Sequence, residues 1–257
     1  MGAEFAIDAA DARHLSREEL THLLLILDEM RRREDQRQFH RLFPDKDTIQ
    51  PDGSLIHARA KYPKHLELFE AGAKYRERCF MAANRIGKTT GGAYEVTCHL
   101  TGLYPGWWVG KRFETPIRCW AAGKTNETTR DIVQAGLLGE VSYAGARKVF
   151  SGTGMVPGKL LGNLAWKQGV QDLVDTIKIK HASGGWSTLG LKSYQQGRGS
   201  FEGTAQHVVW LDEECPIDVY GECLVRTATT GGIILLTFSP LEGMSETVLQ
   251  FMPGIGG

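Results

Sequence analysis

The chain has 257 residues, of which 42% are hydrophobic and 23% are charged, so it can bury a sizeable core as one large or two small domains. Its 30 basic and 30 acidic side chains give a formal net charge of zero, which excludes a polybasic protein that holds nucleic acid by bulk charge alone. No run approaches the roughly 18 to 20 apolar residues of a membrane span, and the cysteines form no C-x-x-C pair, so neither a membrane association nor a zinc or disulfide framework is predicted.

The first predicted element is a helix, or a broken pair of helices, over residues 16–43. Ser16 and Glu19 have the spacing of a capping box. Four leucines have the spacing of one apolar helix face, which needs a covering partner: Leu20, Leu23, Leu24 and Leu27. Residues 44–53 have the composition of a linker. We therefore expect a helical N-terminal extension and linker over residues 1–55, followed by a single domain over residues 56–257.

In that domain, short apolar strands alternate with helical or glycine-rich stretches. This alternation predicts an α/β fold with a mostly parallel sheet flanked by helices. Four strands are predicted, over residues 78–82, 117–122, 207–211 and 232–238. The alternating segment 176–180 and the following segment 187–194 predict an antiparallel hairpin at a sheet edge. Residues 140–170 show no clear pattern.

A phosphate-binding loop is predicted over residues 82–89, which fit G-x-x-x-x-G-K-[ST] at every position except the first. A strand leads in and a helix leads out, so the loop amides would converge on phosphate at a helix N-terminus. Lys88 would reach the β and γ phosphates, and the Thr89 hydroxyl would contact Mg²⁺. Ala82 replaces the first glycine, at a cost of about 1 kcal/mol if a positive φ is needed there. The same letters could also begin a helix that binds no ligand.

Two neighbouring carboxylates, Asp212 and Glu213, follow the predicted strand 207–211. Because side chains alternate along a strand, the two cannot do the same job. Asp212 would hold Mg²⁺, directly or through water, and Glu213 would orient or deprotonate an attacking water. A strand meeting a solvated loop gives the same pattern, but the phosphate loop in the same chain favours hydrolysis of a nucleoside triphosphate.

Two arginines could neutralise charge on the transferred phosphoryl group. Arg85 lies within the phosphate loop, and Arg198 lies on a glycine-flanked loop from which it could reach its own site or that of a neighbour. A surface arginine in a turn is the alternative for Arg198. At the end of the strand 232–238, the Thr237 hydroxyl could contact the γ phosphate and report hydrolysis, unless this segment is a simple turn.

Taken together, these stretches resemble the N-terminal ATPase half of the large terminase subunit of tailed bacteriophages, of the headful-packaging type. The resemblance runs from about Tyr62 to Glu246 and is densest over residues 75–106, 196–222 and 236–245. A deviant first position in the phosphate loop, as at Ala82, is common in that family.

The resemblance implies a P-loop NTPase of the ASCE (RecA-like) class that uses ATP and Mg²⁺ to drive double-stranded DNA into a procapsid. It further implies a pentameric ring that docks on the portal protein, works with the small terminase subunit and acts in the host cytoplasm. By the same analogy, Glu213 is the catalytic carboxylate, Arg198 is a candidate finger acting on the adjacent subunit, and Thr237 couples hydrolysis to movement. Arg85 is also predicted to be catalytic, from its place in the phosphate loop. The ATP-binding set carried over is Ala83, Asn84, Arg85, Ile86, Gly87, Lys88, Thr89, Thr90 and His65.

The sequence departs from the family pattern at two points. His65 stands where family members often carry a glutamine that reads adenine, which leaves the base specificity open. A nuclease domain follows the motor in this family, and the short stretch after Thr237 cannot contain one, so ATP hydrolysis without DNA cleavage is expected.

Two other functions remain open for these residues. One is a helicase-like or recombinase-like translocase that works without a capsid. The other is a noncatalytic scaffold that binds nucleotide only to fix an assembly. Glu213 weighs against the scaffold, because nucleotide binding alone needs no carboxylate placed for water.

Overall fold

The computed structural model describes residues 16–36, 38–50, 52–240, 243 and 245–252, and it divides into two compact units, residues 1–38 and 39–257. This boundary precedes the one expected after residue 55. The reason is that Phe39 and Phe43 are buried in the core of the second unit, where the Phe43 ring packs edge-on against Tyr94 at a centroid distance of 4.8 Å. Residues 39–43 therefore belong to the second compact unit.

In the first unit, helix α1 (Arg17–Gln36) begins with the predicted capping box. The Ser16 amide donates to the Glu19 carboxylate at 2.7 Å, and the Glu19 amide donates to the Ser16 hydroxyl at 3.3 Å. On the predicted apolar face, the Leu24 and Leu27 side chains are exposed. A separate 3₁₀ helix, η2 (Gln38–Leu42), comes next, in keeping with the predicted break.

The predicted linker, residues 44–53, contains one strand of a small hairpin. Strand β1 (Thr48–Ile49) pairs with β2 (Leu55–Ile56) in antiparallel fashion. The Asp47 carboxylate accepts hydrogen bonds from the Ala58 amide at 2.8 Å and the Lys61 ammonium at 2.7 Å, and these bonds lower the pKa of Asp47 to about 2. This segment therefore folds back on itself around one carboxylate.

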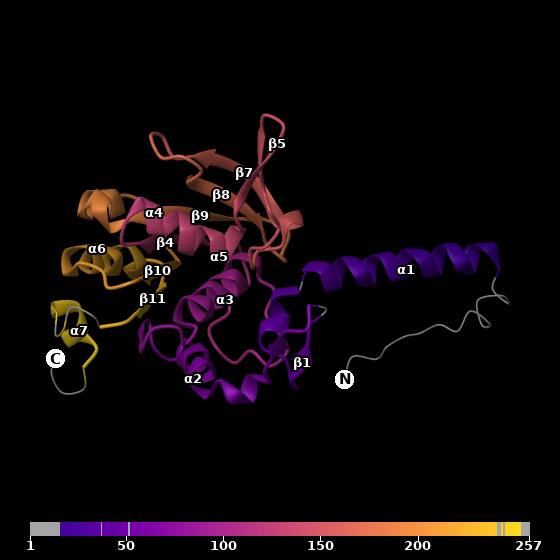
Figure 1. Cartoon of the computed structure of the whole chain (residues 1–257), viewed down its shortest axis with the longest axis horizontal. Coiled ribbons are helices and arrows are strands. Elements are labelled where there is room, and N and C mark those ends of the chain that lie inside the picture. The colour runs from indigo at the N-terminus through magenta and orange to yellow at the C-terminus, as the bar shows by residue number, and fades with distance from the viewer. Residues whose placement is uncertain (1–15, 37, 51, 241–242, 244, 253–257) are drawn as a thin grey trace. The chain divides into compact units, whose positions relative to one another are not determined.

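The second unit is built on a sheet that has, within the described residues, seven strands in the order β3-β11-β10-β4-β9-β8-β7 (Figure 1). The strands are β3 (Glu77–Met81), β4 (Arg118–Gly123), β7 (Leu161–Trp166), β8 (Val174–Lys180), β9 (Trp186–Ser193), β10 (Val208–Asp212) and β11 (Ile233–Phe238). The first five strands in this order pair in parallel. Strand β8 pairs antiparallel with β9, and β7 pairs antiparallel with β8. The four predicted strands and the mostly parallel sheet are thus confirmed.

The predicted antiparallel hairpin is formed by β8 and β9, but its placement at the sheet edge was wrong. Strand β9 pairs in parallel with β4, and β7 pairs outside β8 and forms the edge. Strand β8 alternates as predicted, because Ile177 and Ile179 are buried whereas Lys178 is exposed. The strand that covers it lies within residues 140–170, the stretch that lacks a clear sequence pattern.

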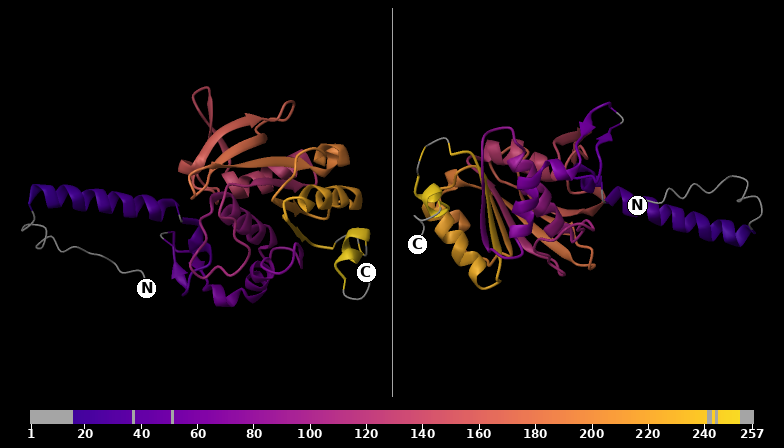
Figure 2. Two further views of the ribbon diagram at one scale, coloured as in Figure 1. Left: turned by 180° about the vertical axis from the view of Figure 1, so that it is seen from behind. Right: turned by 90° about the horizontal axis from the view of Figure 1, so that it is seen from below.

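Helices cover both faces of the sheet (Figure 2). Helix α3 (Lys88–Thr101) packs on the face that carries Val208 and Trp210 of β10, and α6 (Ile217–Ala228) packs on the face that carries Val209 and Leu211. This is the period of two expected for a strand buried on both sides. The remaining helices are η3 (Arg59–Lys61), α2 (Pro63–Ala71), α4 (Asn126–Thr128), the π-helical turn η4 (Thr129–Gln134), α5 (Ala135–Leu138), η5 (Gly158–Leu160), η6 (Tyr194–Gln196), η7 (Arg198–Phe201) and α7 (Glu246–Gln250), and a separate hairpin joins β5 (Val141–Ala144) to β6 (Arg147–Phe150).

The strand order determines where a site can form. Strand β11 lies between β3, which leads into the predicted phosphate loop, and β10, which leads into the two carboxylates. All three strands are parallel, so their carboxyl ends meet at one edge of the sheet, where open α/β sheets bind ligands. No helix in the described part of the chain has the length and apolar character needed to cross a bilayer.

Candidate active site

The predicted phosphate loop joins strand β3 to helix α3. Gly87 precedes the helix with a φ of 83°, a left-handed angle that glycine adopts without strain, and Arg85 has a φ of 65°. Ala82 is not among the residues with a positive φ. The missing first glycine of the motif is therefore not needed for the backbone here, and the strain considered for Ala82 does not arise.

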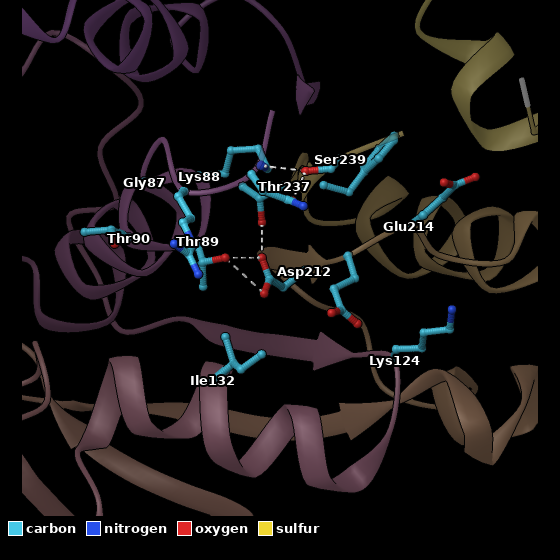
Figure 3. A pocket seen from close by; sticks show the side chains of 14 residues that line it. Gly87, Lys88, Thr89, Thr90, Lys124, Ile132, Asp212, Glu214, Thr237 and Ser239 are labelled. Atoms are coloured by element: carbon cyan, nitrogen blue, oxygen red, sulfur yellow. Dashed lines mark hydrogen bonds between the residues drawn. The ribbon is translucent and has the colours of Figure 1, made fainter. Parts of the chain in front are cut away.

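Lys88 lies between the loop and the end of strand β11. Its ammonium group donates to the Ala83 carbonyl at 2.6 Å and to the Ser239 hydroxyl at 2.8 Å, as Figure 3 shows for the second bond. The Ser239 hydroxyl also lies 2.6 Å from the side-chain oxygen of Asn84. Burial lowers the pKa of Lys88, and the nearby Asp212 carboxylate opposes this shift. The position suits an ammonium group that meets an anionic ligand.

Asp212, the last residue of β10, lies next to the first turn of α3 (Figure 3). The Thr89 hydroxyl lies 3.0 Å and 3.2 Å from its two carboxylate oxygens, and the Thr237 hydroxyl donates to one of them at 2.6 Å. Burial raises the pKa of Asp212 to about 6, although both hydroxyls favour the charged form. A hydroxyl and a carboxylate that converge in this way fit Mg²⁺, which binds a few protein oxygens and completes its shell with phosphate and water.

Glu213 follows Asp212 with a left-handed φ of 65°. Its amide still donates to the Thr237 carbonyl at 2.9 Å, so the strand pairing continues while the chain turns. Strict alternation would send its side chain to the α6 face, yet Glu213 lines the same cavity as Asp212. One carboxylate oxygen of Glu213 is shielded from solvent and has no hydrogen-bond partner among the described residues. It is therefore available to accept a proton or a hydrogen bond from a water.

A single cavity of about 510 Å³ connects these groups. It is lined by residues of the phosphate loop and the start of α3, by residues at or just after the carboxyl ends of strands, and by one residue of η4: Asn84, Arg85, Gly87, Lys88, Thr89, Thr90, Lys124, Ile132, Asp212, Glu213, Glu214, Thr237, Phe238 and Ser239. Among the predicted nucleotide-binding residues, Ala83 and Ile86 lie outside this lining, although the Ala83 carbonyl holds Lys88. Thr237 reaches the cavity but is buried, and its hydroxyl proton is directed to Asp212.

Two predicted residues lie elsewhere. His65, on α2, is buried behind the loop, where its Nε2 lies 3.1 Å from the Gly87 carbonyl and its ring packs edge-on against Phe80. It contacts the loop backbone and does not line the cavity. Arg198 also lies outside the lining, and its guanidinium pairs with the buried Glu222 carboxylate at 3.1 Å.

Five lining residues were not assigned to the site from the sequence: Lys124, Ile132, Glu214, Phe238 and Ser239. Lys124 follows the carboxyl end of β4, and Ser239 follows that of β11, so a position directly after a parallel strand was a usable signal for both. Ile132 comes from the π-helical turn η4, and nothing in its sequence surroundings indicated that it would reach the cavity.

Comparison with known proteins identifies the family. The family model described as "Terminase large subunit, T4likevirus-type, N-terminal" matches residues 79–255. The terminase large subunit of Salmonella phage P22 is 38% identical over 258 residues, a match that covers 93% of this chain and 47% of that relative. The chain thus spans about half the length of the P22 protein.

Two solved structures are more distantly similar. The large terminase of bacteriophage HK97 has a TM-score of 0.45 at 12% identity, over 78% of this chain and 37% of that chain. The large terminase of a thermophilic bacteriophage, in complex with ADP, has a TM-score of 0.43 at 14% identity, over 70% of this chain and 37% of that chain. Both likenesses are too distant to bear on what this chain binds. Because of the family match and the similarity to the P22 protein, this chain belongs to the terminase large subunit family, and it matches the N-terminal part of such subunits.

Proposed function

We propose that this chain is the ATP-hydrolysing motor domain of a DNA-packaging terminase, and that its turnover depends on Mg²⁺. One observation carries the proposal: Lys88 and Thr89 from the phosphate loop and Asp212 and Glu213 from β10 line one cavity, with Thr89 within hydrogen-bond distance of Asp212. A phosphate-binding loop that faces two carboxylates is what hydrolysis of a nucleoside triphosphate requires.

Each side chain has a distinct task in this proposal. The loop amides and Lys88 bind the β and γ phosphates at the N-terminus of α3. Lys88 leaves the Ala83 carbonyl and the Ser239 hydroxyl to do so. Arg85, which lines the cavity, neutralises charge on the transferred phosphoryl group. No residue is proposed to recognise the base of the nucleotide, because His65 contacts the Gly87 carbonyl of the loop backbone and does not line the cavity.

Thr89 and Asp212 are the groups that would hold Mg²⁺, which when bound neutralises charge on the phosphates. Among the described residues, no cluster of three or more His, Cys, Asp or Glu side chains could hold a metal ion. The proposed Mg²⁺ would therefore be bound together with the phosphates of the nucleotide. Glu213, whose second oxygen has no partner within the described chain, accepts the proton of the attacking water.

Replacing Glu213 by Gln tests the enzymatic claim. Glu213→Gln keeps the shape of the side chain but removes the proton acceptor, so phosphate release should fall by about 10² or more while a fluorescent ATP analogue still binds. Lys88→Ala should lose both binding and turnover. The matched control is Glu140→Gln, because Glu140 is an exposed glutamate outside the cavity.

Equal phosphate release by Glu213→Gln and the parent would remove Glu213 from its role. If the parent released no phosphate above a chelator control, the hydrolytic function itself would fail.

The proposal extends to an assembly in the host cytoplasm. Membership in the terminase large subunit family supports a pentameric ring on the portal protein of a procapsid, working with the small terminase subunit on double-stranded DNA. Phosphate release per chain should then rise with protein concentration and with added duplex DNA. A rate per chain that is independent of both would contradict the ring, and strand separation by the protein would favour a helicase-like translocase.

A further inference from the structure

We propose that Trp210 is a positioning residue for the Asp212 carboxylate and acts through the Thr237 hydroxyl. This inference rests on the proposed function, because it assigns Trp210 a part in Mg²⁺-dependent nucleotide binding. Trp210 lies two residues before Asp212 on β10, on the same face of the strand, and its side chain is fully buried. Its indole Nε1–H donates to the Thr237 hydroxyl oxygen at 2.8 Å.

The indole determines where the hydroxyl proton points. An indole N–H can only donate, so the Thr237 oxygen must accept from it. The single hydroxyl proton of Thr237 is then directed to Asp212, whose carboxylate oxygen lies 2.6 Å away. The same oxygen lies 3.0 Å from the Thr89 hydroxyl. Two hydroxyls from different elements therefore fix the rotation of one carboxylate, and Trp210 sets the direction of one of them.

Strand register brings these groups together. Thr237 is the pairing partner of Asp212 across β10 and β11, and Leu235 is the partner of Trp210. The indole consequently reaches diagonally from β10 to the hydroxyl on β11. Thr237 is one hydrogen bond away from the proposed metal ligand Asp212, and Trp210 orients Thr237 in turn. Hydrogen-bond partners outside the ligand shell hold a metal ligand in its binding orientation.

Helix α3 is shaped to accept the indole. A Cβ atom at Gly92 would lie 2.6 Å from Trp210 Nε1 and 2.7 Å from its Cε2, so only glycine fits at this position. Glycine inside a helix costs about 1 kcal/mol relative to alanine, and the close approach of the indole accounts for its use here. Because α3 begins at Lys88, Trp210 links the helix that carries the phosphate loop to the carboxylate opposite it.

The competing explanation is that Trp210 only fills the core. Trp108 provides a matched control, since it is also buried in the α3-side core and donates its indole N–H at 3.0 Å, but to the Lys111 carbonyl, away from the site. Trp210→Phe and Trp108→Phe therefore both remove one buried indole donor. Only the first change would release the Thr237 hydroxyl.

The test compares the affinity for a fluorescent ADP analogue in EDTA and in excess Mg²⁺. In Trp210→Phe, we expect the gain in affinity from Mg²⁺ to fall roughly tenfold while the affinity in EDTA is unchanged. Trp108→Phe should keep the full gain. In a Thr237→Val background, Trp210→Phe should have no further effect, because the hydroxyl through which it acts is already gone. A full gain in Trp210→Phe, or an equal loss in Trp108→Phe, would overturn the proposal.

A second measurement needs no nucleotide and uses the folded parent. The indole N–H resonance that disappears in Trp210→Phe identifies Trp210, and Thr237→Val should shift this resonance upfield while the Trp108 resonance stays in place. An unshifted Trp210 resonance in Thr237→Val would contradict the hydrogen bond. If the parent binds no nucleotide in Mg²⁺, the proposed function fails, and this resonance still decides the hydrogen bond on which the Trp210 proposal depends.

Discussion

At the scale of single residues, Tyr194 supports the turn that directs Glu213 into the cavity. The Tyr194 side chain is buried, and its hydroxyl donates to the Asp212 carbonyl at 2.8 Å. This carbonyl belongs to the peptide bond that joins Asp212 to Glu213, the residue with the left-handed φ. A buried carbonyl that loses its donor is destabilised, so the backbone at this point depends on a residue far away in sequence.

Replacing Tyr194 by Phe should therefore affect both stability and turnover. We expect Tyr194→Phe to lower the free energy of unfolding by about 1 kcal/mol and to lower the rate of phosphate release with little change in nucleotide affinity. Urea unfolding and steady-state kinetics measure the two effects. Tyr143→Phe is the control, because the hydroxyl of the exposed Tyr143 also donates a hydrogen bond, to Asp172, and neither residue lines the cavity. Matching effects of the two variants would argue against a role for Tyr194 at the site.

At the scale of elements, helix α3 carries a buried charge network besides the phosphate loop. Glu95 is fully buried, and burial is the largest single effect on its pKa and raises it. The ion pair with Arg78 of β3, at 2.6 Å, and the contact with His99 together outweigh burial and lower the pKa of Glu95 to about 2. His99 lies one turn further along α3, with Nε2 3.1 Å from Glu95 and Nδ1 2.9 Å from the Tyr104 hydroxyl. The network connects α3 to β3 and to the loop after the helix.

Burial lowers the pKa of His99, although Glu95 acts in the opposite direction. The native state then binds fewer protons than the unfolded chain, whose histidines titrate near about 6.5. Stability from neutral His99 is thus present above that value and decreases as the pH falls below it. The free energy of unfolding should drop between about pH 7.5 and about pH 5.5 in the parent and less steeply in His99→Gln. An unchanged slope in His99→Gln would contradict the assignment.

The sequence was sufficient for elements with strong local patterns and not for those defined by distant partners. The apolar run at residues 233–238 and the loop at 82–89 could be read because each pattern is local. Strand β7 could not, because its pairing with β8 includes two register shifts and its burial is mixed. The division into compact units after residue 38 has no local signal, because Phe39 enters the core only through contacts with rings such as Tyr94, which lies far along the chain.

The same distinction holds for the site. Residue types and motif spacing predicted Lys88, Thr89 and Asp212. The bond between Trp210 and Thr237 depends on strand register, and the pairing of Arg198 with Glu222 depends on how η7 meets α6, so neither could be derived from local pattern. The roles of all these residues, and those of Glu213 and Arg85, stay predictions.

At the scale of the whole molecule, Arg198 bears on how subunits would share a site. Its guanidinium is bound to Glu222, which also pairs with Arg226, and it does not reach the cavity of its own chain. If Arg198 acts, it must first leave Glu222, and in the proposed ring we expect it to act on a neighbouring subunit. Its side chain is 57% exposed, which leaves it accessible to such a neighbour.

Mixing two inactive chains tests this arrangement. Arg198→Ala keeps the phosphate loop, and Lys88→Ala keeps the arginine, so a mixed ring should recover part of the phosphate release that each variant lacks alone. A mixture of Arg226→Ala and Lys88→Ala is the control, because Arg226→Ala also removes an ion pair of Glu222 but keeps Arg198. No recovery in a ring shown to contain both variants would contradict an action of Arg198 across subunits.

The central claim is that the loop around Lys88 and the carboxylates at the end of β10 act on one polyphosphate. A crystal structure of this chain with Mg²⁺ and a nonhydrolysable ATP analogue tests it most directly. We predict the β and γ phosphates against the loop amides and Lys88, the metal between Thr89 and Asp212, and Glu213 facing the γ phosphate. A polyphosphate bound outside this cavity, or bound here with Asp212 and Glu213 turned away from it, would contradict the account.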